Sequence, residues 1–120
     1  MKTKKIILLI IACFVTSLIS ISSISAGTTE IQHNKTVKIK LKTMQCNMCE
    51  KTITEAINSV SGVVKTTVSF KKKSATVVYN ADVTSKEAIE KAITSAGYDA
   101  NNKSADKDAY EKLSSCCKKP

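Results

Sequence analysis

The alternation of apolar and polar residues predicts three short strands in the middle of the chain. Residues 37–41 (VKIKL) alternate between apolar side chains and lysines, a pattern typical of a strand with one buried face. Val64, Val68 and Phe70 are expected to share the buried face of a second strand. Residues 75–79 (ATVVY) are rich in β-branched side chains and follow a lysine-rich turn. We therefore expect the second and third strands to form a β-hairpin.

A helical pattern occurs twice in the chain. Residues 53–62 and residues 89–97 each carry apolar side chains at positions i, i+3, i+4 and i+7, and each segment ends near a glycine. Residues 84–87 (TSKE) have the spacing of a capping box, and residues 47–50 (NMCE) form a similar start signal. Two amphipathic helices are therefore predicted, one after the first strand and one after the hairpin.

This order of elements predicts an α+β fold of the ferredoxin-like βαββαβ type. Both helices would cover one face of a four-stranded antiparallel sheet. The fourth strand, residues 98–100, is short and is expected at an edge of the sheet, where a short strand is tolerated. Residues 105–113 predict a short helix in the C-terminal tail.

The N-terminus has the pattern of a secretory signal peptide. A basic start is followed by an apolar run and then by small residues up to Ala26, after which cleavage is expected. An uncleaved membrane anchor and a lipoprotein modified at Cys13 are the alternatives. The predicted organisation is signal peptide, linker, folded domain and C-terminal tail, at residues 1–26, 27–35, 36–100 and 101–120.

Composition and charge exclude several classes of function. The 120 residues suffice for one small domain, and the formal charge of +9 comes from 19 lysines against 10 acidic residues. No arginine is present for bidentate contacts to phosphate or guanine, so nucleic acid is not the expected partner. Glu50 and Glu55 are expected on the exposed face of the first helix, and no paired carboxylates, Ser-His arrangement or phosphate loop indicates an enzyme.

Two cysteines at the predicted start of the first helix are the candidate chemistry. Cys46 and Cys49 can direct both sulfurs to one point, and the helix N-terminus favours their thiolate forms. Thiolates suit soft ions such as Cu(I) and Zn(II), and two sulfurs alone suit a low-coordinate ion better than a tetrahedral zinc site. We expect Met44 and Met48 to pack the loop as apolar side chains.

Two other interpretations of these cysteines remain open. A thiol–disulfide oxidoreductase of thioredoxin type would also place a CxxC motif at a helix start, but the sole proline here is Pro120. A structural disulfide between this loop and the C-terminal cysteines is the other alternative, because secreted proteins fold in an oxidising environment.

The region from about residue 36 to residue 100 resembles the heavy-metal-associated domain, the module of copper chaperones, metal-ATPase N-terminal domains and periplasmic mercury-scavenging proteins. The resemblance is carried by three motifs, namely Met44-x-Cys46-x-x-Cys49, Gly62-Val63 and Ala96-Gly97-Tyr98.

The resemblance implies that Cys46 and Cys49 bind one soft metal ion in an exposed loop. It also implies that Met44 anchors this loop in the core and that Tyr98 packs near the site. Thr43 stands where the family usually has glycine, so the backbone of the loop is expected to differ there.

A second cysteine pair, Cys116 and Cys117, lies beyond the region of resemblance. We expect the tail to fold back and donate one or both sulfurs, giving a site of three or four sulfurs or a second weak site. The alternative is a mobile tail whose thiols form a disulfide with the loop or with another chain. His33, in the polar linker, is not expected to be a ligand.

Together these features predict a non-enzymatic metal-binding protein, secreted across the inner membrane to the periplasm. It would bind Cu(I) or alternatively Hg(II), with Zn(II) less favoured, and would sequester the ion or pass it to a membrane metal transporter or metal-transporting ATPase by thiolate exchange. We expect a monomer, with a metal-bridged dimer as the alternative. A thiol–disulfide exchange protein and a disulfide-stapled protein-binding module are the other functions considered.

Overall fold

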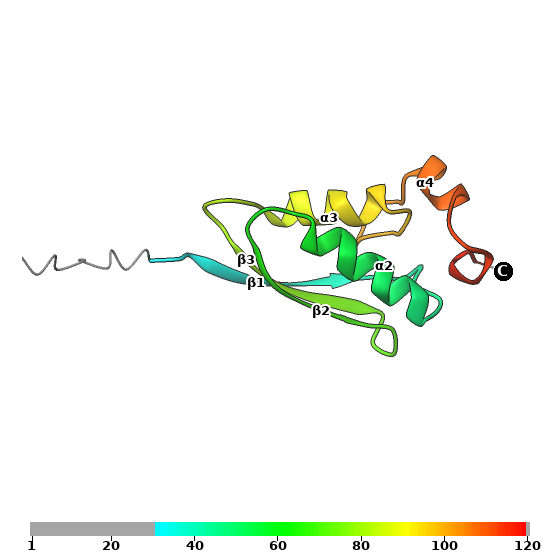
Figure 1. Cartoon of the computed structure of the whole chain (residues 1–120), viewed down its shortest axis with the longest axis horizontal. Helices are drawn as coiled ribbons and strands as arrows, with labels where there is room; N and C mark the ends of the chain where they lie inside the picture. Colours follow the sequence, from blue (N-terminus) through cyan, green and yellow to red (C-terminus); the bar gives the residue numbers. More distant parts are fainter. Residues whose placement is uncertain (1–30, 120) are drawn as a thin grey trace, which may run out of the picture. The chain divides into compact units, whose positions relative to one another are not determined.

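The computed structural model describes residues 31–119, and the predicted signal peptide and its cleavage site lie outside them. The described chain contains three strands, three α-helices and one turn of 3-10 helix (Figure 1). In chain order they are β1 (Asn34–Lys40), α2 (Asn47–Asn58), β2 (Val63–Ser69), β3 (Ser74–Asn80), α3 (Lys86–Ser95), α4 (Lys107–Glu111) and η2 (Ser115–Cys117). None of the helices in residues 31–119 is long and apolar enough to cross a bilayer.

The strands form one antiparallel sheet in the order β1-β3-β2. Helices α2 and α3 lie side by side on one face of this sheet (Figure 1). The predicted hairpin and the predicted pair of helices on one face are therefore confirmed. One detail of β2 differs: the pairing with β3 shifts at Val64, which is exposed, and Val63 packs against the core in its place.

The predicted fourth strand is wrong, because within the described residues the sheet has three strands. Asn101 adopts a left-handed backbone conformation, with φ at 54°, and turns the chain back so that Ala100 bridges to Lys103. The N–H of Asn101 donates to the carbonyl oxygen of Lys40 at 2.9 Å, and the side-chain oxygen of Asn101 accepts the N–H of Lys40 at 2.9 Å. A single asparagine thus bonds both backbone groups of Lys40, at the end of β1 beside which a fourth strand was expected.

The helix starts differ by one residue from the predicted caps. Cys46, rather than Asn47, is the N-cap of α2, and its side chain forms no capping hydrogen bond. Ser85, rather than Thr84, is the N-cap of α3, and its hydroxyl accepts the N–H of Ala88 at 3.2 Å. Serine directly follows threonine here, so two good capping residues compete for one position.

The core lies between the two helices and the sheet. The apolar stripes of both repeats are buried, which confirms the predicted helix faces. Fully buried side chains from the strands, the helices and the loops are Ile39, Leu41, Met44, Ile53, Ile57, Val77, Ile89, Ile93 and Tyr98. The same cluster contains the sulfur atoms of Cys49 and Cys117, so the core extends to the predicted site.

Candidate metal-binding site

The loop between β1 and α2 is fixed by burial and by hydrogen bonds at both ends. Met44 has no exposed surface, in agreement with its expected packing, and its N–H donates to the carbonyl oxygen of Leu41 at 3.2 Å. Thr43 is also buried, and its hydroxyl oxygen accepts the N–H of Asp99 at 2.9 Å. Thr43 therefore ties this loop to the segment that leads into the tail. Met48 was expected to pack but is 57% exposed, so that prediction is wrong.

The first cysteine pair lies where α2 begins. Cys46 is the N-cap and Cys49 is the third residue of the helix, and their sulfur atoms are 3.4 Å apart. Cys49 is completely buried, whereas Cys46 is partly exposed. The pair thus has one sulfur in the core and one that solvent or a second protein can reach.

The C-terminal tail is held against the end of α3. The N–H of Asp106 donates to the carbonyl oxygen of Thr94 at 2.9 Å, and the Asp106 carboxylate caps α4 by accepting the N–H of Ala109 at 2.8 Å. A Cβ added at Gly97 would meet the backbone of Ala109 and Tyr110 at 3.0 Å. The absence of a side chain at Gly97 therefore lets α4 pack directly against the chain.

The tail brings its two cysteines to the first pair. The Cys46 sulfur lies 3.5 Å from that of Cys116 and 3.8 Å from that of Cys117, and the two tail sulfurs are 3.9 Å apart. These three sulfurs all lie within 4.8 Å of one another. Cys117 is 3% exposed, Cys116 is exposed, and all four cysteines in the described residues are free thiols. The expectation that the tail folds back over the loop agrees with this arrangement.

Cys46 and the two tail thiols differ in acidity. Although the Cys46 sulfur forms no capping hydrogen bond, the backbone N–H of Cys49 at the helix start lowers the pKa of Cys46 to about 7, and the neighbouring thiols act in the same direction. Burial raises the pKa of Cys117 to about 12. The hydrogen bond with Cys46 raises the pKa of Cys116. Cys46 therefore ionises before either tail thiol.

Tyr98 forms the floor beneath the sulfurs. It is fully buried, and its hydroxyl group has no hydrogen-bond partner among the described residues. Burial, followed by the nearby sulfurs of Cys117 and Cys49, raises the pKa of this phenol above its usual value. The position agrees with the expectation that Tyr98 packs near the site.

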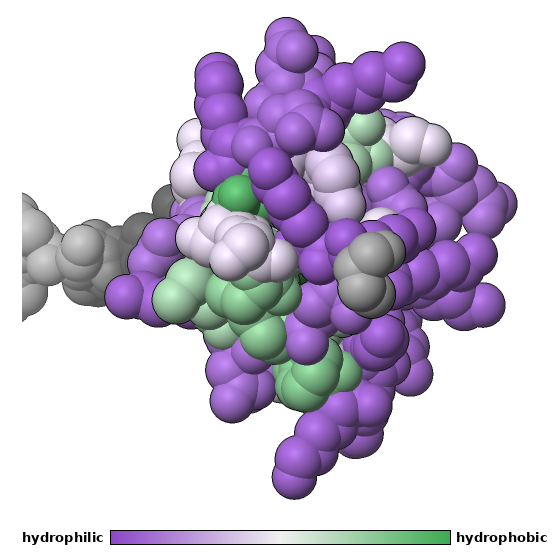
Figure 2. Space-filling model, turned by 90° about the vertical axis from the view of Figure 1, so that its right-hand side faces the viewer, coloured by the Kyte–Doolittle hydropathy of each residue, from purple (hydrophilic) through white to green (hydrophobic). Residues whose placement is uncertain are grey.

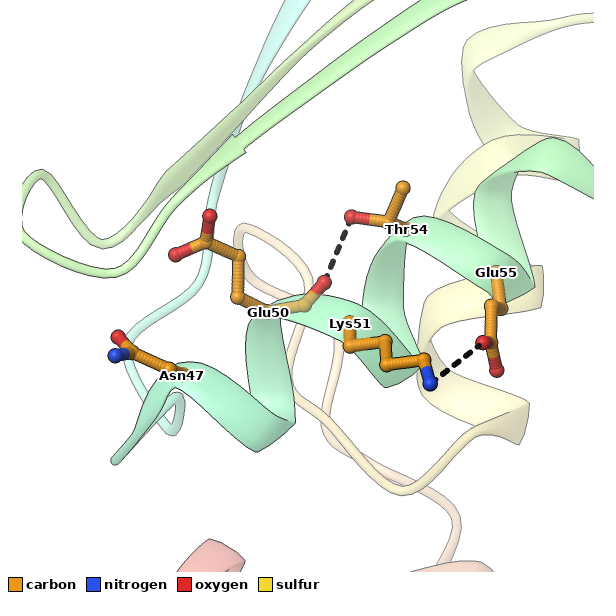
Figure 3. Close-up of a pocket in the computed structure, with 5 residues that line it drawn as sticks. All are labelled: Asn47, Glu50, Lys51, Thr54 and Glu55. Carbon is orange, nitrogen blue, oxygen red and sulfur yellow. Dashed lines mark hydrogen bonds and ion pairs between the residues drawn. The ribbon is translucent and has the colours of Figure 1, made fainter.

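Other features of the surface lie apart from the sulfurs. His33 pairs with Asp82 at 3.1 Å and is not part of the sulfur group. The end of the domain that carries the tail is mostly hydrophilic, with a smaller apolar patch (Figure 2). A shallow hollow on α2, drawn in Figure 3, is lined by polar residues and contains no cysteine.

Figure 3 also shows that Glu50 points toward the β2–β3 hairpin, away from Lys51 and Glu55. Its carboxylate accepts the N–H of Phe70 at 3.0 Å. The expected exposure is therefore confirmed for Glu55 and wrong for Glu50, which is half-buried.

The fold and the CxxC loop define a metal-binding domain, and the comparison of sequences agrees. Residues 33–99 match the heavy-metal-associated domain family, and the chain belongs to this family. The domain itself is a non-enzymatic metal-binding module, although it also matches a small part of larger metal-transporting ATPases.

Two relatives show the range of ions within the family. The mercuric transport protein periplasmic component of Shewanella putrefaciens is 39% identical over 64 residues, which cover 53% of this chain and 70% of that protein. The copper-exporting P-type ATPase of Staphylococcus saprophyticus is 36% identical over 81 residues, covering 68% of this chain but 10% of the ATPase. The chain thus spans about a tenth of that ATPase.

Solved structures support the same assignment. Oxidized MerP from Ralstonia metallidurans CH34 superimposes with a TM-score of 0.55 at 34% identity, covering 57% of this chain and 94% of MerP. The mercury-bound form of MerP, the periplasmic protein from the bacterial mercury detoxification system, superimposes with a TM-score of 0.52 at 32% identity, with coverage of 57% and 94%. The C-terminal tail lies beyond the family match, which ends at residue 99.

Proposed function

We propose that this protein binds one soft metal ion, Cu(I) or Hg(II), through the thiolates of Cys46 and Cys49. The observation that carries the proposal is the 3.4 Å approach of these two sulfurs at the start of α2. The low pKa of Cys46 supports it, because the thiolate is the form that binds metal. Zn(II) is less favoured at Cys46 and Cys49 alone, because two sulfurs leave a tetrahedral zinc ion short of ligands.

The ion would be passed on by ligand exchange. Cys46 is partly exposed, so a partner's thiol can attack the bound ion before Cys49 releases it. The partner would be a membrane metal transporter or a metal-transporting ATPase, in keeping with the transport functions named for the relatives.

We place this exchange outside the cytoplasm, with the protein acting as a monomer in the periplasm. Two observations support that location: the signal-peptide pattern ending at Ala26 and the periplasmic location named for the mercuric transport relative. The domain organisation proposed is a removed signal peptide, a linker, the metal-binding domain and a cysteine-bearing tail.

Native mass spectrometry of the reduced chain tests the binding. The chain is titrated anaerobically with Cu(I), Hg(II) and Zn(II), one at a time, and compared with the Cys46→Ser and Cys49→Ser variants. Retention of one Cu(I) or Hg(II) ion, lost or strongly weakened in both variants, is the expected result. Ion retention that survives both substitutions, or a chain that holds no ion and loses two hydrogens in air, would contradict the proposal and favour the disulfide interpretations.

A further inference from the structure

We propose that the tail cysteines, Cys116 and Cys117, join the ion bound at Cys46, so that the site holds the ion with at least three sulfur atoms. The inference deepens the proposed function and rests on it, because it concerns the same ion. It goes further in assigning the C-terminal tail, which lies outside the family match, a direct part in binding.

The sulfur separations carry the proposal. With a metal–sulfur bond of about 2.3 Å, two sulfurs on opposite sides of a linear ion would be about 4.6 Å apart, while three in a plane would be about 4.0 Å apart and four in a tetrahedron about 3.8 Å apart. The separations among Cys46, Cys116 and Cys117 are 3.5, 3.8 and 3.9 Å. They lie within about 0.5 Å of the three-sulfur value, and the Cys49 sulfur is not part of this group of three.

The Cys46–Cys49 pair alone fits a linear ion poorly. Its separation of 3.4 Å is about 1.2 Å shorter than linear coordination requires. Cys49 is buried in the core at the start of α2, so neighbouring side chains leave its sulfur little room to move. A geometry with more than two sulfurs accommodates the pair at close to its present separation.

The tail is held in place by contacts that do not involve sulfur. The backbone N–H of Lys119 donates to the hydroxyl of Tyr110 at 2.9 Å, and the ammonium of Lys118 donates to the carbonyl oxygen of Glu111 at 2.6 Å. Leu113 also packs against the core. The chain therefore positions the two tail sulfurs before any ion arrives, which lowers the entropic cost of adding them as ligands.

A site of three or more sulfurs differs in function from a two-sulfur site. Each added ligand on the same chain raises retention, because the ion must lose all of them before it escapes. Transfer to a partner would then require the ion to lose the exposed sulfur of Cys116 first and the buried sulfur of Cys117 afterwards. We therefore infer that the tail holds the ion between uptake and transfer.

The test counts sulfur atoms around Cd(II), a soft probe ion that accepts three or four thiolates. The reduced full-length chain is loaded anaerobically, and the sulfur number is measured by X-ray absorption and by the ultraviolet thiolate-to-cadmium absorption per ion. We expect three or four sulfurs in the wild-type chain and two in the Cys116→Ser/Cys117→Ser variant. Loss of Cd(II) to a chelator should be at least about tenfold faster in that variant.

The Ser114→Ala/Ser115→Ala variant is the matched control, because it changes the two neighbouring tail residues and leaves all four sulfurs. It should keep the wild-type sulfur number and release rate. Two sulfurs in the wild-type chain, or the same number and rate in the variant without tail thiols, would overturn the inference and leave binding by Cys46 and Cys49 intact. Binding that survives both Cys46→Ser and Cys49→Ser would instead contradict the proposed function itself.

Discussion

The close contact between Gly97 and α4 gives a way to move the tail without changing a sulfur. Gly97 has a φ of 96°, and a Cβ added there would meet backbone atoms of Ala109 and Tyr110 at 3.0 Å. Backbone atoms cannot rotate away as a flexible side chain can. In a Gly97→Ala variant the new methyl group must therefore displace the backbone of α4. We expect this displacement to loosen the tail from the end of α3.

The size of the effect follows from two contributions. Left-handed backbone costs an alanine roughly 1–2 kcal/mol relative to glycine. If α4 stayed in place, overpacking would add about 1–3 kcal/mol, and detachment of α4 avoids this second cost. We expect the free energy of unfolding to fall by about 1–2 kcal/mol while the tail becomes mobile.

Gly62→Ala is a matched control for strain. Gly62 has a φ of 90°, and its added Cβ would lie 2.9 Å from the side chain of Val83, so the substitution imposes a similar backbone cost away from the tail. Both variants should lose similar stability in urea denaturation. Only Gly97→Ala should release the tail.

The assay measures how fast Cys117 reacts with an alkylating reagent in the metal-free reduced chain. A Cys116→Ser background allows mass spectrometry to follow the tail peptide through Cys117 alone. Because Cys117 is 3% exposed, its alkylation should be slow in this background and at least about tenfold faster when Gly97→Ala is added. Equal rates in the Gly97→Ala and Gly62→Ala chains would refute the idea that the glycine contact positions the tail.

Three further predictions concern single side chains. Glu50→Ala should lower the free energy of unfolding by about 1–2 kcal/mol, because the N–H of Phe70 loses its acceptor. The control substitution at the exposed Glu55, Glu55→Ala, should change the free energy of unfolding by less than about 0.5 kcal/mol. Equal losses for the two variants in urea denaturation would contradict this prediction. The rate of alkylation of Cys46 should rise with pH through a midpoint near 7, because the pKa of this thiol is lowered to about 7 and the thiolate is the nucleophile. A midpoint above 8 would show that the helix start does not act on this thiol. Tyr98→Phe should change stability by less than about 0.5 kcal/mol, because the hydroxyl has no hydrogen bond to lose, and a loss above 1.5 kcal/mol would indicate a bond to sulfur.

The strands and helices could be predicted because each has a regular period of buried residues. The lysines at alternate positions of residues 37–41 identify the outer face of β1, and the isoleucines of the two repeats identify the inner faces of the helices. The fourth strand was wrong because its outcome depends on Asn101. That residue bonds to Lys40 through both its backbone and its side chain, a competition that strand patterns do not contain.

Buried Glu90 contacts the turn that stands in place of the predicted fourth strand. Burial alone would raise the pKa of Glu90, but hydrogen bonds from Lys103 and Asn101 lower it below its usual value. The carboxylate lies 2.6 Å from the Asn101 amide nitrogen and 2.8 Å from the Lys103 ammonium. This cluster stabilises the turn that replaces the strand. Glu90 lies 11 residues before Asn101 in sequence, beyond the reach of local patterns.

Part of the site was predictable because it depends on residues that are close together in sequence. The spacing of Cys46 and Cys49 and the helix that follows them are local features, so the sequence indicated their proximity. The position of Cys116 and Cys117 depends on contacts between the tail and the end of α3, chiefly at Gly97, and no pattern within the tail specifies them. From the sequence, the two adjacent cysteines after a short helix indicated that two further thiols were present but not where they lie.

The exposure of the four sulfurs predicts the order in which they take part in binding and exchange of the ion. Each cysteine pair combines a buried sulfur, Cys49 or Cys117, with an accessible one, Cys46 or Cys116, and the two accessible sulfurs are 3.5 Å apart. An incoming ion or a partner's thiol therefore meets Cys46 and Cys116 first, while the core-bound sulfurs lie beneath. Exchange would begin at the accessible sulfurs and end at the buried ones, so a variant lacking only Cys116 should slow uptake more than one lacking only Cys117. Stopped-flow mixing of the reduced chain with Cd(II) measures this difference, and the reverse order would contradict entry through the accessible pair.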